Sequence, residues 1–188
     1  MAGDPSASEL SFSLRGLLLL ASPALADGTF ERSVIFMAEH SREKGAMGVI
    51  INHRSESTVG DIISDPALDP LHPLPIHQGG PLSTNELSFS CFSWNETTGL
   101  EFKPHISPQN AVALMKKKTN LVRASVGHSA WAPGQLEDEL QRNTWITTKP
   151  TSALLTVPND LSLWKSLMEN ISPYHHLLSQ APKNPFLN

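Results

Sequence analysis

The chain has 188 residues, of which 39% are hydrophobic and 17% charged, and its formal net charge is −4. A chain of this length forms one domain with a sizeable core, and this composition excludes an intrinsically disordered protein. The acidic balance argues against a nucleic-acid-binding surface, which is normally basic, so we expect no nucleic-acid partner. No stretch approaches the ~20 apolar residues of a membrane span, so we expect no membrane partner either.

The single cysteine, Cys91, limits the chemistry further. One cysteine excludes both an internal disulfide and a cysteine metal cage. The eight histidines also lack a ligand spacing such as His-x-x-x-His. We therefore expect a cytoplasmic protein that has no metal site and no cofactor.

Residues 1–13 are small and polar, and we expect a mobile tail ahead of one domain that spans residues 14–188. The apolar run Leu17–Ala21 then predicts a buried strand. The segment Arg15–Ala26 also resembles a signal peptide, because it begins with a basic residue and ends in Ala-x-Ala. We favour the strand because the apolar run is short and Ser22-Pro23 interrupts it.

The stretch Arg32–Asn52 predicts the centre of the fold. It contains two continuous apolar runs, Val34–Ala38 and Met47–Ile51, which the charged connector Ser41–Lys44 joins. A strand that is apolar on both faces belongs inside a sheet that is covered on both sides. Because the connector is too short for a helix, the two runs predict an antiparallel hairpin. Polar residues close both strands, so the strand ends are candidates for a site.

Short strands and helices alternate along the remaining chain. Apolar or alternating patterns predict strands at Ile76–Gln78, Leu87–Phe92, Leu100–Phe102, Leu121–Gly127, Thr144–Thr148 and Ala153–Val157. Capping residues and helical spacing predict helices at Thr58–Ile63, Ser107–Lys118, Pro133–Arg142, Asn159–Asn170 and Tyr174–Ser179. Loops are predicted for His53–Ser57 and for Asp65–Pro75, which holds four prolines. Without a linker or a repeat, this order predicts one domain of mixed α/β fold, close to the α+β class.

Three blocks of sequence carry a resemblance to a known family. The first holds Leu18-Leu-Leu-Ala-Ser-Pro23, Phe30-Glu-Arg-Ser-Val-Ile35, Glu39-His40 and Gly45-Ala-Met-Gly-Val-Ile-Ile-Asn52. The second is Gln78-Gly-Gly-Pro-Leu82, and the third runs from Val126-Gly-His-Ser-Ala-Trp131 through Glu139-Leu140, with Trp145 after it. In this order, from about Leu17 to Trp164, the chain resembles the AlgH/YqgE family.

The resemblance implies a single domain whose mostly antiparallel sheet bends into a pseudo-barrel with flanking helices. It implies no demonstrated catalysis, since the biochemical function of that family is unestablished. The name of one member suggests control of alginate synthesis. The chain departs from the family pattern at Asp27-Gly28, at Asn52-His53-Arg54 and at Gly127-His128. No role is therefore carried over to His128.

Five residues are candidates for a ligand-binding cleft between the ends of the hairpin and the loop and helix Trp131–Glu139. They are Arg32, His40, Asn52, Trp131 and Gln135. Arg32 suits an anion, and free N–H groups at the start of the helix suit one as well. The alternative is that the polar groups pair with one another, while Trp131 packs on the sheet and Gln135 ties down its own loop.

Gly79 and Gly80 are a second candidate, as a backbone nest for a phosphate or carboxylate. Pro81 follows them and supplies no N–H group. A tight turn that needs positive φ is the alternative, and we favour it.

These observations predict a module that binds an unknown small molecule or protein. The first alternative is a hydrolase or transferase that uses His40 and Glu39 as acid–base groups. That alternative requires both side chains to reach one cleft, although adjacent residues of a strand normally face opposite sides. The weaker alternative is a transcriptional regulator, which the acidic charge and the missing helix-turn-helix motif disfavour.

Overall fold

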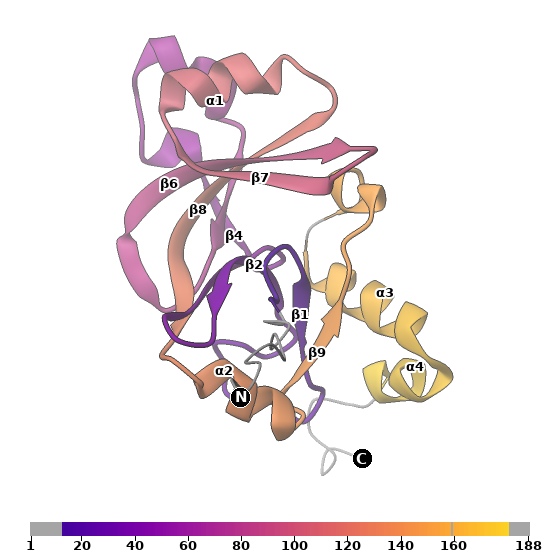
Figure 1. Ribbon diagram of the computed structural model, residues 1–188. Coiled ribbons are helices and arrows are strands. Elements are labelled where there is room, and N and C mark those ends of the chain that lie inside the picture. The colour runs from indigo at the N-terminus through magenta and orange to yellow at the C-terminus, as the bar shows by residue number, and fades with distance from the viewer. Residues whose placement is uncertain (1–12, 159, 181–188) are drawn as a thin grey trace, which may run out of the picture.

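The computed structural model describes residues 13–158 and 160–180, and Figure 1 shows its arrangement. The tail expected at residues 1–13 therefore lies outside the described residues, except for Ser13. Within the described ranges, nine strands form one sheet: β1 (Leu18–Ala21), β2 (Val34–Ser41), β3 (Gly45–Ile50), β4 (Arg54–Thr58), β5 (Pro75–Gln78), β6 (Leu82–Asn95), β7 (Gly99–Ile106), β8 (Asn120–Trp131) and β9 (Trp145–Thr148).

Helices surround this sheet. The α-helices in the described ranges are α1 (Pro108–Met115), α2 (Gln135–Gln141), α3 (Leu161–Ile171) and α4 (Pro173–Ser179). Three short 3₁₀ helices accompany them: η1 (Val59–Asp61), η2 (Pro66–Leu71) and η3 (Ser152–Leu155). None of the described helices is long and apolar enough to cross a membrane.

The sheet branches at β8, which pairs with three strands. The order along the main path is β4-β5-β8-β3-β2-β1-β9, and β6 adds to β8 and carries β7. Only the pairing of β5 with β8 is parallel among the described strands. Figure 1 shows β6 and β8 curving together, with α1 at one end of the molecule, α2 at the other, and α3 and α4 along one side. The sheet forms a half-barrel, so the expected single mixed domain with a bent, mostly antiparallel sheet is confirmed.

The predicted hairpin is the core of this sheet. Strands β2 and β3 pair with Ile35 opposite Ile50 and Phe36 opposite Val49. Successive residues of β2 face two different core clusters, one that includes Leu136 of α2 and one that includes Trp164 of α3. Because both faces are covered, every residue of the run Val34–Ala38 is buried. Each large apolar side chain buried in this way stabilises the fold by about 1.5–3 kcal/mol.

Close approach of two backbones explains the Gly-Gly turn. A Cβ on Gly79 would meet the carbonyl oxygen of Gly127, and a Cβ on Gly80 would meet the backbone of His128. The Gly79 N–H donates to the Val126 carbonyl, so it is committed to the sheet and is not available to an anion. Gly80 has a φ of +151°. The geometry is that of a turn pressed against β8, where any side chain would clash.

Three segments differ from the sequence predictions. The expected loop His53–Ser57 is largely β4, an edge strand that pairs only with β5 among the described strands. The expected strand Ala153–Val157 is largely the 3₁₀ helix η3, which buries Leu154. The proline-rich segment Asp65–Pro75 contains η2, in which Asp65 caps the helix by accepting from the Ala67 N–H. Proline at the first helical position is compatible with such a short helix.

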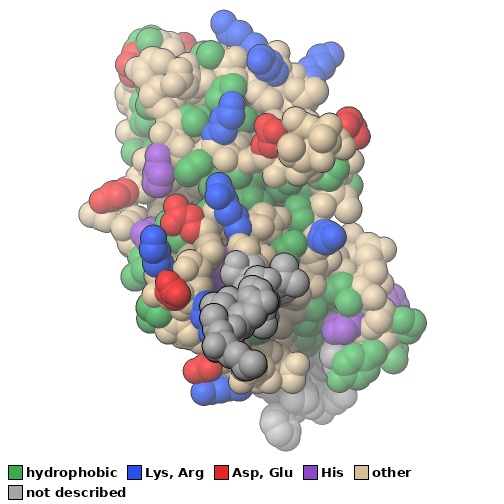
Figure 2. Space-filling model, viewed as in Figure 1, with side chains coloured by type: hydrophobic (Ala, Val, Ile, Leu, Met, Phe, Trp, Pro, Cys, Tyr) green, Lys and Arg blue, Asp and Glu red, His purple; other side chains and the backbone are tan. Residues whose placement is uncertain are grey.

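Charged side chains of both signs are interspersed over most of the face in Figure 2, and basic side chains gather at the end that carries α1. The lysine run Lys116–Lys118 begins at the C-cap of α1. Positive charge there interacts favourably with the helix dipole.

Candidate functional site

The five candidate residues do not line one cleft, because they lie at opposite ends of the β2–β3 hairpin. Arg32 and Asn52 lie at the open end, ahead of β2 and after β3. His40 lies near the turn, where Ala46 of β3 pairs with Trp131 of β8. The six residues of β3 rise about 3.4 Å each, so the two groups are about 20 Å apart.

At the turn end, the carboxylate of Glu139 collects three hydrogen bonds. Oε2 accepts from the indole N–H of Trp131 at 2.9 Å and from that of Trp145 at 2.7 Å. Oε1 accepts from Nε2 of Gln135 at 2.9 Å. The Oε1 atom of Gln135 accepts from the Ala132 N–H at 3.0 Å. Trp131 and Gln135 thus fix the loop and helix to the sheet, as the structural alternative predicted.

His40 lies at this end as well, and its side chain is only 4% exposed. Its Nδ1 accepts a hydrogen bond from the Leu14 N–H at 3.2 Å, so the proton of the neutral ring is on Nε2. Nε2 lies 3.2 Å from Oε1 of Glu137 on α2. His40 therefore lies between the N-terminal segment, to which it is hydrogen-bonded, and α2, which Nε2 approaches without a hydrogen bond.

A β-bulge in β2 directly precedes Glu39 and His40. The pairing shifts between Met37 and Glu39, which leaves Ala38 as the extra residue. Beyond the bulge Glu39 is exposed and lines a surface hollow with Leu100 and Lys103 of β7, whereas His40 faces Leu14 and α2. The two side chains face opposite sides of the sheet, so they do not form one acid–base pair.

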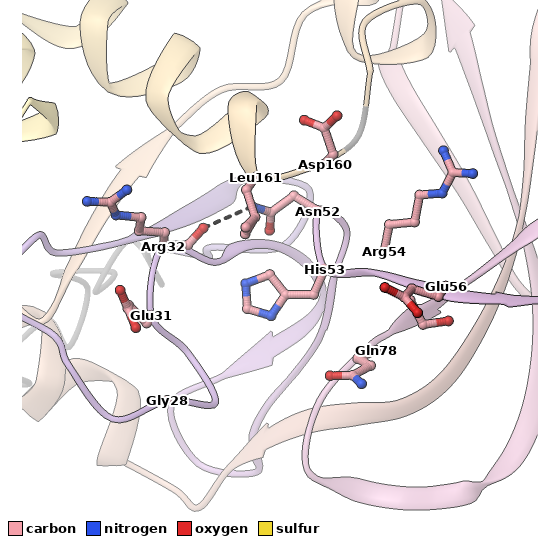
Figure 3. Close-up of a pocket in the computed structure, with 11 residues that line it drawn as sticks. Gly28, Glu31, Arg32, Asn52, His53, Arg54, Glu56, Gln78, Asp160 and Leu161 are labelled. Carbon is pink, nitrogen blue, oxygen red and sulfur yellow. Dashed lines mark hydrogen bonds between the residues drawn. The ribbon is translucent and has the colours of Figure 1, made fainter. Parts of the chain in front are cut away.

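The open end of the hairpin carries the larger cavity. We call it the rim hollow; it measures about 930 Å³ and Figure 3 shows the side chains around it. Its lining comes from the loop before β2, the segment from β3 into β4, the end of β5 and the start of α3: Gly28, Glu31, Arg32, Asn52, His53, Arg54, Ser55, Glu56, Gln78, Asp160 and Leu161.

Asn52 fixes the backbone at this rim. Its side chain is fully buried, Oδ1 accepts from the Val34 N–H at 2.7 Å, and Nδ2 donates to the Arg32 carbonyl at 2.9 Å. Arg32 itself has a φ of +53°, which is a left-handed conformation that costs a non-glycine residue about 1–2 kcal/mol. Its guanidinium carbon lies 5.5 Å from the centre of the Trp164 ring. Strained residues of this kind cluster at binding sites.

His53 lies in the middle of the rim hollow in Figure 3, near Glu31 and Gln78. Its Nε2 atom is buried and has no hydrogen-bond partner among the described residues. Burial lowers the pKa of His53 below its ordinary value of 6.5, while a hydrogen bond to the Glu31 backbone and the Glu31 charge act in the opposite direction. In the neutral tautomer that carries its proton on Nδ1, Nε2 is an acceptor.

Charges of both signs surround His53. Arg32 and Arg54 are the basic residues of the lining, and Glu31, Glu56 and Asp160 are the acidic ones. The carboxylate of Asp160 caps α3 by accepting from the Ser162 N–H at 2.8 Å, and hydrogen bonds from Ser162 lower the pKa of Asp160. The rim therefore suits a polar ligand with groups of opposite character.

The sequence prediction missed most residues of the rim, among them His53, Arg54, Glu56 and Gln78. They meet because β4 pairs with β5, with Arg54 opposite His77. The one signal in the sequence is the polar run from Arg54 to Thr58, which has no apolar residue and most of which was predicted as the loop His53–Ser57. The described residues contain no cluster of His, Cys, Asp and Glu that could hold a metal ion.

Comparisons with known proteins agree with the fold and place the chain in a family. Two solved structures are similar: one from Corynebacterium diphtheriae (TM-score 0.69, 22% identity, covering 96% of this chain and 95% of that one) and the solution structure of the AlgH protein from Pseudomonas aeruginosa (TM-score 0.62, 24% identity, covering 97% and 98%). At these identities the likeness concerns the fold alone.

The chain is also similar in sequence to proteins of several bacteria. A UPF0301 protein of Bacteroides thetaiotaomicron is 30% identical over 188 residues, which are 93% of this chain and 91% of the relative. One of Streptomyces coelicolor is 30% identical over 194 residues, with 94% and 96% covered. The family model described as AlgH-like, DUF179, matches residues 18–175. The chain therefore belongs to the AlgH-like family.

Proposed function

We propose that this protein is a binding module whose rim hollow holds a small polar molecule that carries both a hydrogen-bond donor and an anionic group. The volume of about 930 Å³ is within the range of about 300–1,000 Å³ that is typical of small-molecule sites. The mixed charges of the lining favour a polar ligand over an apolar one.

The single observation that carries the proposal is the bare Nε2 atom of His53. Buried polar atoms almost always have a hydrogen-bond partner, and this one has none among the described residues. With its proton on Nδ1, the neutral ring offers a lone pair at Nε2. A hydroxyl or amino group of a ligand would supply the missing donor.

The two arginines of the lining suit the anionic group of the proposed ligand. Arg32 comes from the loop before β2, and Arg54 is an exposed residue of β4. Figure 3 shows them on opposite sides of His53. A guanidinium group binds carboxylates and phosphates through paired hydrogen bonds, so an acidic group of the ligand fits either arginine. Small hydroxy acids and amino acids combine both features.

Ligand binding is a better-supported function than acid–base catalysis in which Glu39 and His40 are the reacting pair. Glu39 and His40 face opposite sides of the sheet, and His40 is enclosed by the N-terminal segment and α2. Neither residue lines the rim hollow.

The test is a ligand-detected NMR screen of small hydroxy acids and amino acids against the full chain, followed by titration of any hit. We expect a hit whose binding weakens by about tenfold or more in His53→Phe, which keeps a planar aromatic ring and removes both nitrogens, because one hydrogen bond to the ligand is lost. Gln78→Ala changes an exposed rim residue, and Gln141→Ala on α2 is its matched control. A hit that binds His53→Phe and Gln78→Ala as tightly as the unmodified chain contradicts the proposal.

A further inference from the structure

A second cavity borders the rim hollow at Arg54 and is unlike it in charge. This basic hollow measures about 170 Å³ and is lined by Arg54, His77 and Arg123, together with four apolar residues. No carboxylate lines it among the residues that the structure describes. Arg54 contributes to both cavities.

Strand pairing places the three basic residues on one face of the sheet. Arg54 of β4 lies directly opposite His77 of β5, and His77 lies opposite Ser125 of β8. Arg123 is two residues before Ser125, so it faces the same side. Strands β4, β5 and β8 thus bring the guanidinium groups of Arg54 and Arg123 and the imidazole of His77 to the lining of one cavity.

Arg123 is the unusual member of this group. It is 5% exposed, and the one hydrogen bond of its side chain within the described residues runs from Nη1 to the Ile51 carbonyl at 2.6 Å. Its guanidinium carbon also lies 5.9 Å from the centre of the Phe92 ring. Nε is buried without a partner, and no carboxylate of the described residues forms an ion pair with Arg123. A buried charge is costly unless a counter-charge and hydrogen bonds accompany it.

The charge on Arg123 persists at neutral pH. Burial lowers its pKa to about 9, which is still about two units above neutrality. Arg54, by contrast, is exposed and has a nearby negative charge in Asp160, which lies in the rim hollow. The unbalanced positive charge is therefore concentrated on Arg123, at the inner wall of the basic hollow.

We propose that the basic hollow is a phosphate-binding site, in which Arg123 binds the anion from the sheet and Arg54 closes over it. A liquid water molecule occupies about 30 Å³, so 170 Å³ corresponds to about five or six waters, enough for the five heavy atoms of a phosphate group. Tetrahedral phosphate presents oxygens in several directions, which suits donors that arrive from three strands. The site goes beyond the proposed function, because the basic hollow is a separate cavity from the one that His53 lines.

The test is thermal unfolding of the full chain with inorganic phosphate at constant ionic strength, which sodium chloride maintains. We expect a saturable rise of the midpoint temperature with phosphate, since a ligand that binds only the folded state stabilises it. Arg54→Gln should weaken the apparent phosphate affinity by about tenfold or more, as expected for loss of one charge-assisted hydrogen bond. Arg42→Gln makes the same change at an exposed residue after β2 and should leave the affinity unaltered.

Arg123→Met separates binding from folding. The variant keeps a long side chain without the charge, so we expect it to fold and to lose the phosphate response. If it does not fold, Arg54→Gln is compared with Arg32→Gln, because Arg32 lines the rim hollow alone: phosphate in the basic hollow is lost in the first variant and kept in the second. His53→Phe should retain the phosphate response, so failure of the rim ligand and failure of this site are distinguishable. The proposal is overturned by no saturable shift, by an equal response in Arg54→Gln, or by an equal response to acetate.

Discussion

Asn52 holds Arg32 in its left-handed conformation by donating a hydrogen bond from Nδ2 to the Arg32 carbonyl at 2.9 Å. The same side chain accepts from the Val34 N–H at 2.7 Å, so it continues the β2–β3 pairing by one step beyond the last backbone bond, from the Ile51 N–H to the Val34 carbonyl. A side chain that was a candidate for ligand binding thus has both polar ends committed to the backbone. Asn52 therefore contributes to the rim hollow by fixing the backbone that lines it.

Replacing Asn52 by alanine should destabilise the protein strongly. The substitution leaves the Val34 N–H and the Arg32 carbonyl without partners at a buried position, at a cost of about 2–4 kcal/mol in the free energy of unfolding. Asn110→Ala, at an exposed position of α1, should change that free energy by less than about 0.5 kcal/mol. Urea unfolding of the two variants measures the difference, and equal values would show that the Asn52 side chain does not fix the rim.

Two substitutions at Arg32 should separate backbone strain from side-chain contacts. Arg32→Gly and Arg32→Ala both remove the contact with Trp164, but only glycine adopts a φ of +53° without strain. We expect the glycine variant to be more stable than the alanine variant by about 1 kcal/mol. Chemical denaturation of both variants under the same conditions measures this difference. A more stable alanine variant would mean that the rim backbone relaxes freely.

Much of the fold could be predicted from local pattern, because its central strands are buried on both faces. The runs Val34–Ala38 and Met47–Ile51 are continuous and apolar, and they correspond to β2 and β3. The edge strand β4 was missed because Arg54–Thr58 has no apolar residue and is defined only by its pairing with β5. The run at Ala153 was wrongly predicted as a strand, since a short apolar run does not distinguish a strand from one buried helical turn.

The site was harder to predict than the fold. The meeting of Arg32 with Asn52 follows from the hairpin, whose open end brings both residues together. The same hairpin carries His40 to the other end, so its geometry already argues against a shared cleft. His53, Arg54 and Gln78 reach the rim through the β4–β5 pairing, and His77 and Arg123 meet through β5 and β8. Such long-range pairings leave no local signal in a single sequence.

The three hydrogen bonds at Glu139 predict that the Trp131 region is structural. Glu139→Gln replaces a charged acceptor by an amide whose N–H₂ group faces donors, so we expect a loss of about 2–3 kcal/mol in the free energy of unfolding. Asp138→Asn, at an exposed neighbour on α2, is the control and should change little. Denaturant unfolding followed by tryptophan fluorescence measures both. If Glu139→Gln behaves like the control, the cluster does not stabilise the loop.

The lowered pKa of His53 predicts how stability depends on pH. The unfolded chain protonates this histidine near 6.5, whereas the folded chain does so only at lower pH because burial disfavours the charged ring. Between the two pKa values the unfolded state binds more protons, so the free energy of unfolding rises with pH through this window and levels off above 6.5. His53→Phe should remove this part of the dependence, while His176→Phe on α4 should retain it. The measurement is the difference between urea unfolding at pH 5 and at pH 8 for all three proteins. An unchanged difference in His53→Phe would show that the ring is protonated equally in both states.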